Sequence, residues 1–356
     1  MGVRYIGSKA RVADHILDLA SESETGRFVD AFCGTGSVAA AAAGRGWAVS
    51  VNDSLPSSVA MSVAAVAGVG NVEFGMLDGY GAAVEALNSV PGVPGFLHAE
   101  YSPASAKTGG VERRYFTEVN AARLDAMRMR IAEWSHAGAL TWVEEQLLLA
   151  DLMCAANSVA NISGTYGCFL RAWTPSALRP VNVAARRLPQ RTTDVAASVK
   201  DVFDVVTTSA DVVYYDPPYT KRQYSAYYHI LETLHAGDAP EVDGVTGLRP
   251  WQHKSSVFCY KTKALDALTE LIAGTVARKI LLSYSSEGHV TRDQLLGSLS
   301  EAGHVTVHEV KTIGRYRPNA GAAAAGEHVM EYVIEIEPVD SGRASADAAS
   351  TEAVCA

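Results

Sequence analysis

The chain has 356 residues, enough for one large domain or two, and a formal net charge of −9 that argues against indiscriminate coating of nucleic acid. No apolar run reaches the ~18 residues that a membrane span needs, and the N-terminus lacks the basic-then-apolar pattern of a secretion signal. Five scattered cysteines without a Cys-x-x-Cys pair favour a cytoplasmic protein with no metal site and no membrane attachment.

The N-terminal part of the chain predicts a β-α-β unit. Apolar residues at near-helical spacing indicate a helix within residues 10–20. Residues 28–32 and 47–51 have the apolar pattern of strands, and an alanine-rich helix over residues 38–43 connects them. This unit is the elementary piece of a doubly wound, mostly parallel sheet.

The regular alternation fails after Asp53 for more than a hundred residues. Residues 121–134 and 142–158 predict helices, and a segment rich in Gly, Pro and Ser predicts a loop between residues 91 and 110. We therefore expect residues 70–190 to form a largely helical insert.

Strand patterns return in the last part of the chain, at residues 197–199, 212–215, 279–284, 304–310 and 329–336. The last two flank a Gly/Ala-rich loop and predict an antiparallel hairpin, and the polar stretch 338–356 predicts a disordered tail. The sequence thus predicts an α/β sheet domain, built from residues 1–69 and 191–337 around the helical insert.

A glycine turn follows the first predicted strand, in Asp30-Ala-Phe-Cys-Gly34-Thr-Gly36-Ser37. Two glycines spaced two apart let the backbone approach a ligand, but Ala39 stands where a dinucleotide-binding turn has its third glycine, which disfavours a nicotinamide oxidoreductase. A carboxylate before the turn suits a ligand with a positive amine, such as S-adenosylmethionine, better than a pyrophosphate. Asp53 can accept hydrogen bonds from both ribose hydroxyls. The alternative is a tight turn whose glycine serves packing.

The tetrapeptide Asp216-Pro217-Pro218-Tyr219 directly follows the apolar run of residues 212–215. Tyr219 can stack on a flat ring, while Asp216 and a carbonyl fixed by proline geometry can accept the hydrogens of an exocyclic amine. The motif predicts a site that presents such an amine to an electrophile. A proline-stiffened loop is the alternative.

Two further segments suggest binding roles. In Tyr5-Ile-Gly-Ser-Lys9, Lys9 can pair with a cofactor carboxylate while Tyr5 covers the site, although a lysine before a helix is more often a surface charge. Residues 170–193 contain five arginines and no acid. Such a strip can contact a nucleic-acid backbone, although taken alone it is somewhat more often an ordinary solvated face. These arginines are Arg171, Arg179, Arg186, Arg187 and Arg191, and Lys221, Arg222, Lys254, Lys261, Lys263, Arg315 and Arg317 extend the basic track.

The order of these segments resembles the alpha-type (Dam-like) N6-adenine-specific DNA methyltransferases, most of all the modification methylases of restriction-modification systems. The resemblance rests on residues 5–9, 28–38, 163–169, 211–219 and 222–229. It implies a Rossmann-like, class I S-adenosylmethionine-dependent methyltransferase fold, with residues 70–190 as the target-recognition insert.

The resemblance also implies a role for particular residues. The catalytic loop would be Asp216, Pro217, Pro218 and Tyr219, and the cofactor site Tyr5, Lys9, Asp30, Phe32, Gly34, Gly36, Ser37 and Asp53. An acid would meet the cofactor's adenine, with Asp201 as the candidate and Asp204 and Asp194 as rivals. The five arginines, Arg222 and Tyr224 would contact DNA; Tyr224, Tyr227 and Tyr228 share a helical face and fit either a pocket wall or helix packing.

The expected function is site-specific transfer of a methyl group from S-adenosylmethionine to N6 of an adenine flipped out of double-stranded DNA. A cognate restriction endonuclease is the expected partner. An RNA adenine methyltransferase and a noncatalytic, S-adenosylmethionine-binding DNA regulator are the alternatives. A cytosine-N4 methyltransferase is disfavoured because position 216 is Asp rather than Ser.

Overall fold

The computed structural model describes residues 7–21, 25–310 and 330–338. Its frame is a seven-stranded sheet with the order β3-β2-β1-β4-β5-β7-β6. The strand β7 runs antiparallel to both of its neighbours, β5 and β6. The strands are β1 (Arg27–Asp30), β2 (Ala48–Asp53), β3 (Val195–Val199), β4 (Val212–Tyr215), β5 (Lys279–Ser285), β6 (Gly303–Val310) and β7 (Glu331–Pro338). The α/β fold and the closing hairpin are confirmed; residues 339–356 of the expected tail lie outside the described ranges.

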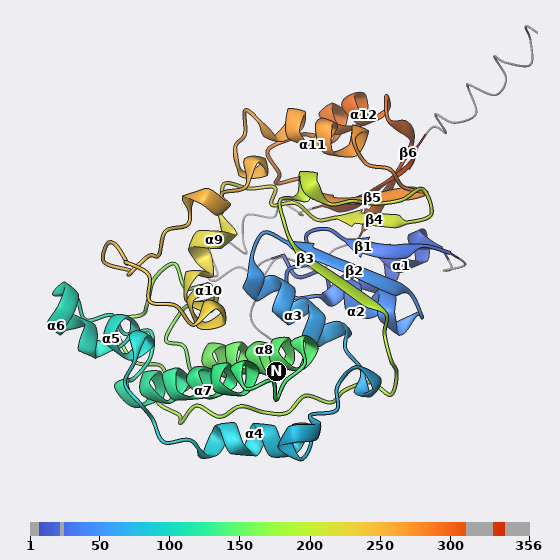
Figure 1. Ribbon diagram of the computed structural model, residues 1–356. Coiled ribbons are helices and arrows are strands. Elements are labelled where there is room, and N and C mark those ends of the chain that lie inside the picture. The colour runs from blue at the N-terminus through green and yellow to red at the C-terminus, as the bar shows by residue number, and fades with distance from the viewer. Residues whose placement is uncertain (1–6, 22–24, 311–329, 339–356) are drawn as a thin grey trace, which may run out of the picture.

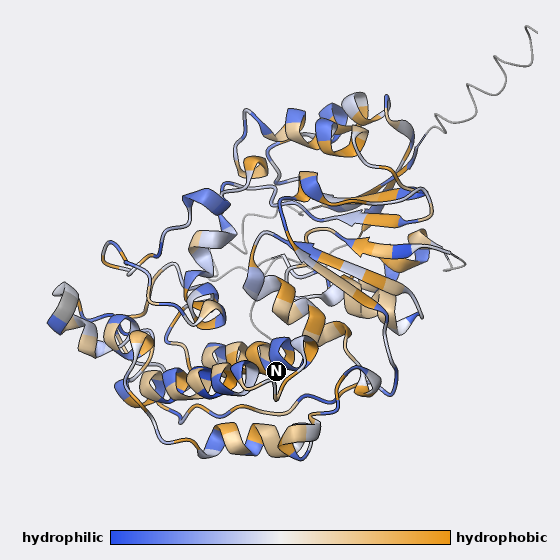
Figure 2. Cartoon of the chain, viewed as in Figure 1, coloured by the Kyte–Doolittle hydropathy of each residue, from blue (hydrophilic) through white to orange (hydrophobic). Residues whose placement is uncertain are grey.

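Helices cover both faces of this sheet (Figure 1). Side chains of β4 alternate between two apolar layers: Val212 and Tyr214 pack toward one face, Val213 and Tyr215 toward the other. The first face carries α1 (Ala13–Ala20), α2 (Ser37–Gly44) and α3 (Pro56–Val66), and the second carries α11 (Ala264–Ala273) and α12 (Arg292–Leu299). The strands and the helix faces toward them are coloured as apolar in Figure 2.

A separate group of helices packs on the outer side of α3. It consists of α4 (Tyr80–Ser89), α5 (Phe96–Tyr101), α6 (Ala106–Gly109), α7 (Glu118–His136), α8 (Trp142–Ser158), α9 (Tyr224–Tyr227) and α10 (His229–Ala236). Short 3-10 turns occur at Val69–Asn71, Gly75–Leu77, Pro103–Ser105, Val202–Asp204, Gln252–Lys254 and Val257–Cys259. The two helices expected within the insert are confirmed as α7 and α8. None of the helices in the described ranges is both long and apolar enough to cross a membrane.

The expected loop between residues 91 and 110 is wrong in part, because α5 and α6 form there. The carboxylate of Asp125, on α7, accepts hydrogen bonds of 2.9 Å from the backbone N–H groups of Gly95, Leu97 and His98 at the start of α5. A helix this short is marginal alone. Its N-terminal cap comes from a distant helix, so local composition could not reveal it.

The core of the helical layer continues into segments that flank the insert. Ala60, Met61 and Ala64 of α3 belong to it, as do residues of α10 such as Leu231. The division into residues 1–69 with 191–337 and residues 70–190 stays a prediction. In packing terms the helical layer also includes α3 and α10, because their outward faces pack on the apolar side chains of that layer.

Truncation of this shared core gives a first prediction. Leu148 on α8 is fully buried in the helical layer, whereas Val119 on α7 is 71% exposed. Leu148→Ala should lower the free energy of unfolding by about 2–5 kcal/mol because it leaves a cavity. Val119→Ala, the control, should change it by less than about 0.5 kcal/mol. Urea denaturation followed by circular dichroism measures both, and equal effects would contradict the assigned packing.

Candidate active site

The sheet topology places a crevice at the carboxyl ends of its central strands. The chain moves outward from β1 through β2 to β3, then returns to β4 on the other side of β1. At such a switch point the connections diverge and leave room for a ligand. Asp30 and Asp53 end β1 and β2, and Asp216 directly follows β4; all three line a pocket of about 840 Å³, part of it open to solvent.

The two glycines of the turn after β1 have different tasks. Gly34 has a φ of +50°, lines the pocket, and donates its backbone N–H to Asp53 Oδ2 at 3.1 Å. Gly36 has a φ of +77°, and a Cβ there would lie 2.6 Å from the Cα of Ser62 on α3. Only glycine fits that position. Gly34 therefore exposes backbone to the pocket, whereas Gly36 lets α2 and α3 approach closely.

The carboxylate of Asp30 is buried and incompletely paired. The residue is 2% exposed, and its Oδ1 has no hydrogen-bond partner among the described residues. Burial, reinforced by the nearby charge of Asp216, raises the pKa of Asp30 to about 8. An unsatisfied buried carboxylate facing a cavity is a site for a cation, and an ammonium group would restore its charged form.

Both carboxylate oxygens of Asp53, unlike Oδ1 of Asp30, have hydrogen-bond partners. Its Oδ1 accepts the N–H of Leu55 at 3.0 Å, while Oδ2 holds the Gly34 turn. Burial raises the pKa of Asp53 to about 6 despite these bonds. Each carboxylate oxygen retains a second lone pair, so hydroxyl groups of a ligand can still donate to it.

The loop after β4 is braced from two directions. The backbone N–H of His289 donates to the carbonyl of Tyr219 at 2.9 Å. The side chain of Gln223 makes two hydrogen bonds to the backbone of Ser256, at 2.8 and 3.2 Å. The Tyr219 ring also packs at 5.6 Å, centroid to centroid, from Tyr284. These contacts hold Asp216-Pro-Pro-Tyr219 at the pocket wall.

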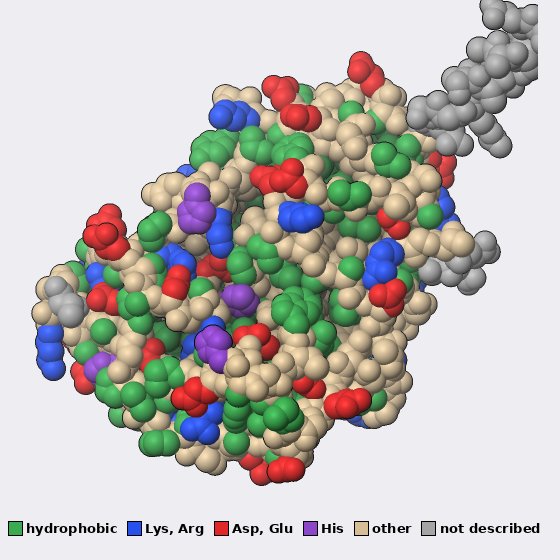
Figure 3. Space-filling model, in the orientation of Figure 1, with side chains coloured by type: hydrophobic (Ala, Val, Ile, Leu, Met, Phe, Trp, Pro, Cys, Tyr) green, Lys and Arg blue, Asp and Glu red, His purple; other side chains and the backbone are tan. Residues whose placement is uncertain are grey.

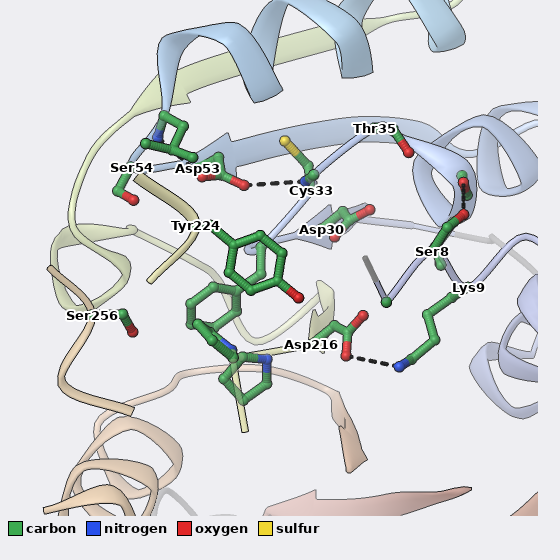
Figure 4. Close-up of a pocket in the computed structure, with 18 of the residues that line it drawn as sticks. Ser8, Lys9, Asp30, Cys33, Thr35, Asp53, Ser54, Asp216, Tyr224 and Ser256 are labelled. Atoms are coloured by element: carbon green, nitrogen blue, oxygen red, sulfur yellow. Dashed lines mark hydrogen bonds and ion pairs between the residues drawn. The ribbon is translucent and has the colours of Figure 1, made fainter. Parts of the chain in front are cut away.

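Lys9 reaches the same pocket from the segment before α1. It is 6% exposed, and its Nζ lies 3.2 Å from Asp216 Oδ1, as Figure 4 shows. Burial lowers the pKa of Lys9, but the charges of Asp216, Tyr219 and Glu331 outweigh burial and raise it. In this structure Lys9 therefore contacts the expected catalytic acid; its contact with a cofactor carboxylate stays a prediction.

The three tyrosines after the loop divide between the two expected roles. Tyr224 lines the pocket, and its ring points into it in Figure 4. Tyr228 is buried in the core of the helical layer, and Tyr227 packs against that core. The Tyr224 and Tyr228 rings stack 6.0 Å apart, centroid to centroid. Tyr224 therefore lines the pocket, while Tyr227 and Tyr228 anchor this segment to the core of the helical layer.

The three candidate acids near β3 lie outside the pocket. Asp201 is exposed and accepts the N–H of Phe203 at 3.2 Å, which caps a 3-10 turn. Asp194 pairs with Arg27 at 2.9 Å, at the opposite end of β3, and Asp204 is exposed. The structure brings none of the three into the pocket lining.

The predicted arginine strip separates into two kinds of residue. Arg186 pairs with the buried carboxylate of Asp151 at 2.7 Å, and Arg191 donates to Thr193 and to the carbonyl of Val66. Arg171, Arg179, Arg187 and Arg222 are exposed. On the face shown in Figure 3, basic and acidic side chains are interspersed. Contacts of these arginines with DNA stay a prediction, and two of the guanidinium groups already have intramolecular partners.

Several pocket residues were not among those expected to hold the cofactor or to act in catalysis, and one of them, Lys254, was expected only in the basic track. Lys254 lines the pocket and pairs at 2.8 Å with Glu232, whose other oxygen accepts the N–H of Ser57 in the first turn of α3. The remaining such residues are Gly7, Ser8, Cys33, Thr35, Val38, Ser54, Leu55, Tyr214, Gln223, Ser225 and Ser256. Of the expected residues, Lys9, Phe32, Ser37, Pro217, Pro218 and Tyr219 do line the pocket, whereas Tyr5, Arg315 and Arg317 lie outside the described ranges.

The pocket's donor and acceptor set fits S-adenosylmethionine. Asp30 offers an unpaired acceptor for the amine, and Asp53 offers acceptors for ribose hydroxyls. Gly34 exposes backbone beside them, and the rings of Phe32 and Tyr224 supply apolar walls. Within the described ranges no cluster of three or more His, Cys, Asp or Glu could hold a metal ion.

Comparison with known proteins gives one family. Residues 5–295 match the family model for D12 class N6 adenine-specific DNA methyltransferases. The chain is similar to the type II methyltransferase M.FokI of Planomicrobium okeanokoites, at 31% identity over 351 residues, or 94% of this chain and 52% of that protein. It is similar to the modification methylase StsI of Streptococcus sanguinis, at 28% identity over 344 residues, with 94% and 52% covered.

A shorter relative is covered almost throughout. The type II methyltransferase M.NlaIII of Neisseria lactamica is 30% identical over 301 residues, which cover 82% of this chain and 86% of that protein. By contrast, the chain spans about half the length of M.FokI and of StsI.

The environment of Asp30 predicts an unusual dependence of stability on pH. The unfolded carboxyl loses its proton near pH 3.8, whereas the folded one keeps it to about pH 8. Between these values the folded state binds more protons, so its stability should fall as pH rises, by up to about 1.4 kcal/mol per unit. Asp30→Asn should flatten this slope and be the more stable protein at pH 8, while binding S-adenosylhomocysteine more weakly.

Denaturation at a series of pH values, with calorimetric titration of the ligand, tests both effects. Asp266→Ala is a matched control, because Asp266 is exposed on α11. A variant that loses stability at pH 8 and binds the ligand as the parent does would contradict the assigned role of Asp30.

Proposed function

The chain belongs to the family of D12 class N6 adenine-specific DNA methyltransferases, and we propose that it transfers a methyl group from S-adenosylmethionine to N6 of an adenine flipped out of double-stranded DNA. The observation that carries the proposal is the pairing of sites in one pocket. Asp30 and Asp53 provide a place for the methyl donor, and Asp216 and Tyr219 provide one for an amine-bearing ring.

When bound, S-adenosylmethionine supplies an electrophilic methyl group on a positively charged sulfur. Asp30 would pair with the amine of the methionine moiety and Asp53 with the ribose, which fixes the direction of the donor. Phe32 and Tyr224 would exclude water from it. The protein's part at this end of the pocket is binding and orientation.

At the other end, Asp216 and the carbonyl of Pro217 would accept the two hydrogens of the target amine, while Tyr219 stacks on the base. The lone pair of that amine is delocalised into the ring, so hydrogen bonds that draw electron density onto nitrogen favour attack. In the proposed transfer the N6 lone pair would form the new nitrogen–carbon bond, and the electrons of the broken carbon–sulfur bond would remain on sulfur. The methylated nitrogen then loses one proton to water.

A base inside a duplex cannot reach Asp216, so the adenine must leave the stack. We propose that the helical layer, residues 70–190 in particular, recognises the target sequence. The modification methylases among the relatives suggest a restriction endonuclease as the cognate partner and the cytoplasm as the location. An RNA adenine methyltransferase is the second candidate, and parallel assays on duplex DNA and structured RNA separate the two.

A basic surface beside the pocket supports a DNA substrate. Lys221 and Arg222 follow the catalytic loop after Thr220, and the thiol of Cys259 donates to the carbonyl of Arg222 at 3.3 Å. Lys261 and Lys263 follow Cys259, and both are exposed. None of these four cations forms an ion pair with a residue that the structure describes, so they are available for the phosphates that flank a flipped base.

Asp216→Ala should abolish most methyl transfer, by about 100-fold or more, because it removes the acceptor for the target amine. Binding of S-adenosylhomocysteine should remain. Transfer of a tritiated methyl group to duplex DNA gives the rate, and mass spectrometry of the digested product should show N6-methyladenine. Asp266→Ala should act as the parent does. Methylation of a ring carbon, or an Asp216→Ala variant as fast as the parent, would contradict the proposal.

The double substitution Lys261→Ala with Lys263→Ala should weaken DNA binding and flatten its salt dependence. Each lost phosphate contact lowers the slope of log affinity against log salt concentration by about 0.9. Arg278→Ala is the control, since Arg278 is exposed at the start of β5, the end of the sheet away from the pocket. Fluorescence anisotropy with labelled duplex at several salt concentrations measures the slopes, and equal slopes for both variants would count against this surface.

A further inference from the structure

We infer that Lys9 is a positioning residue that keeps Asp216 ionised and directed toward the target amine, rather than a ligand of the cofactor carboxylate. The inference rests on the proposed function and concerns how its catalytic acid is prepared. It assigns to the N-terminal segment a part in the chemistry of the base, and not only in the binding of the methyl donor.

The ion pair is enclosed on both sides. Lys9 and Asp216 have side-chain exposures of 5% and 17%, and their Nζ and Oδ1 atoms lie 3.2 Å apart. Lys9 Nζ also lies 3.9 Å from Glu331 Oε2, at the start of β7, and 5.4 Å from the centroid of the Tyr219 ring. An ammonium held by two acids and a ring face has little freedom to move.

The backbone around Lys9 is fixed to the cofactor side of the pocket. The hydroxyls of Ser8 and Ser37, the latter in the first turn of α2, lie 3.2 Å apart. Gly7 has a φ of +80°, and a Cβ there would lie 3.2 Å from the hydroxyl of Tyr224. The segment therefore crosses the pocket from the glycine turn to the catalytic loop and delivers Lys9 to Asp216.

Asp216 needs such a cation because acids surround it. Burial raises its pKa, Glu331 raises it further, and Lys9 acts in the opposite direction. Asp30 shares the pocket and interacts with the same carboxylate. The titratable groups that face Asp216 among the described residues are Lys9, Asp30, Glu331, Tyr214, Tyr219 and Tyr224, and Lys9 is the cation among them.

The protonation state of Asp216 decides what it can do for an amine. A carboxylate only accepts hydrogen bonds, whereas a protonated carboxyl also donates one. An exocyclic amine has two N–H donors and a lone pair that is delocalised into the ring. Groups that accept hydrogen bonds from those N–H donors favour the geometry in which the lone pair can attack, and a group that donates to the nitrogen does not. Without Lys9, the pKa of Asp216 would be higher, so that more of the carboxyl would hold a proton at a given pH and lose part of its acceptor capacity.

The test is the pH dependence of single-turnover methyl transfer, which reports chemistry separately from product release. Activity should fall as pH falls through the pKa of Asp216. Lys9→Met should move this acidic limb to higher pH by about one unit or more, so that the rate at a pH on the limb drops about tenfold or more and recovers at higher pH. Lys9→Arg, which keeps a positive charge, should restore the parent's profile.

Calorimetric titration of S-adenosylhomocysteine distinguishes this role from simple cofactor binding. If Lys9 acts only by positioning Asp216, Lys9→Met should change the dissociation constant of S-adenosylhomocysteine by less than about threefold. An unchanged pH profile with a dissociation constant raised about tenfold or more would overturn the inference and make Lys9 a cofactor ligand only. A folded Lys9→Met that is inactive at every pH would overturn it as well.

A second variant keeps the inference testable if Lys9→Met does not fold. Glu331→Gln removes a negative charge near Asp216 and should shift the acidic limb to lower pH, the opposite direction. A limb that stays in place would count against the assigned electrostatics. The proposed function fails separately, if the parent protein methylates no adenine at all.

Discussion

The grouping of three carboxylates at one edge of the sheet, that of Asp30 buried and those of Asp53 and Asp216 partly buried, is the constraint on which the rest of this structure depends. Asp30, Asp53 and Asp216 end or follow parallel strands that lie side by side. Concentrating negative charge away from water is unfavourable unless partners are supplied. The protein supplies them unequally: two backbone N–H groups hold Asp53, Lys9 pairs with Asp216, and Asp30 Oδ1 has no partner among the described residues. This imbalance favours a ligand that places a positively charged group beside Asp30.

The same edge joins the sheet to the helical layer. Glu232, on α10, accepts the N–H of Ser57 at the start of α3 and pairs with Lys254 at the pocket. A carboxylate at a helix N-terminus also favours the helix dipole. One buried acid thus ties together α3, which is shared by both layers, the helix after the catalytic loop, and a pocket-lining cation.

The site was predictable wherever one short segment carries both a backbone requirement and a functional group. Asp30 with Gly34, and Asp216 with Tyr219, are such cases, and all four line the pocket. Prediction was weaker where the partner of a side chain is distant in sequence. Arg186 was expected to be available for phosphate, but Asp151 on α8 holds it. Asp201 was chosen by its place after β3, yet its carboxylate caps the following turn.

The sequence by itself determined the fold class, the strands and the residues of the two central motifs. Strand periodicity, glycine turns and proline stiffness are local properties, so they can be recognised in a single chain. Only the tertiary structure decided that Lys9 meets Asp216 across 207 positions (216 − 9), that Gly36 packs on Ser62, and that Lys254 reaches the pocket. Those contacts depend on how the sheet brings distant segments together, and no local pattern encodes the distance between two side chains.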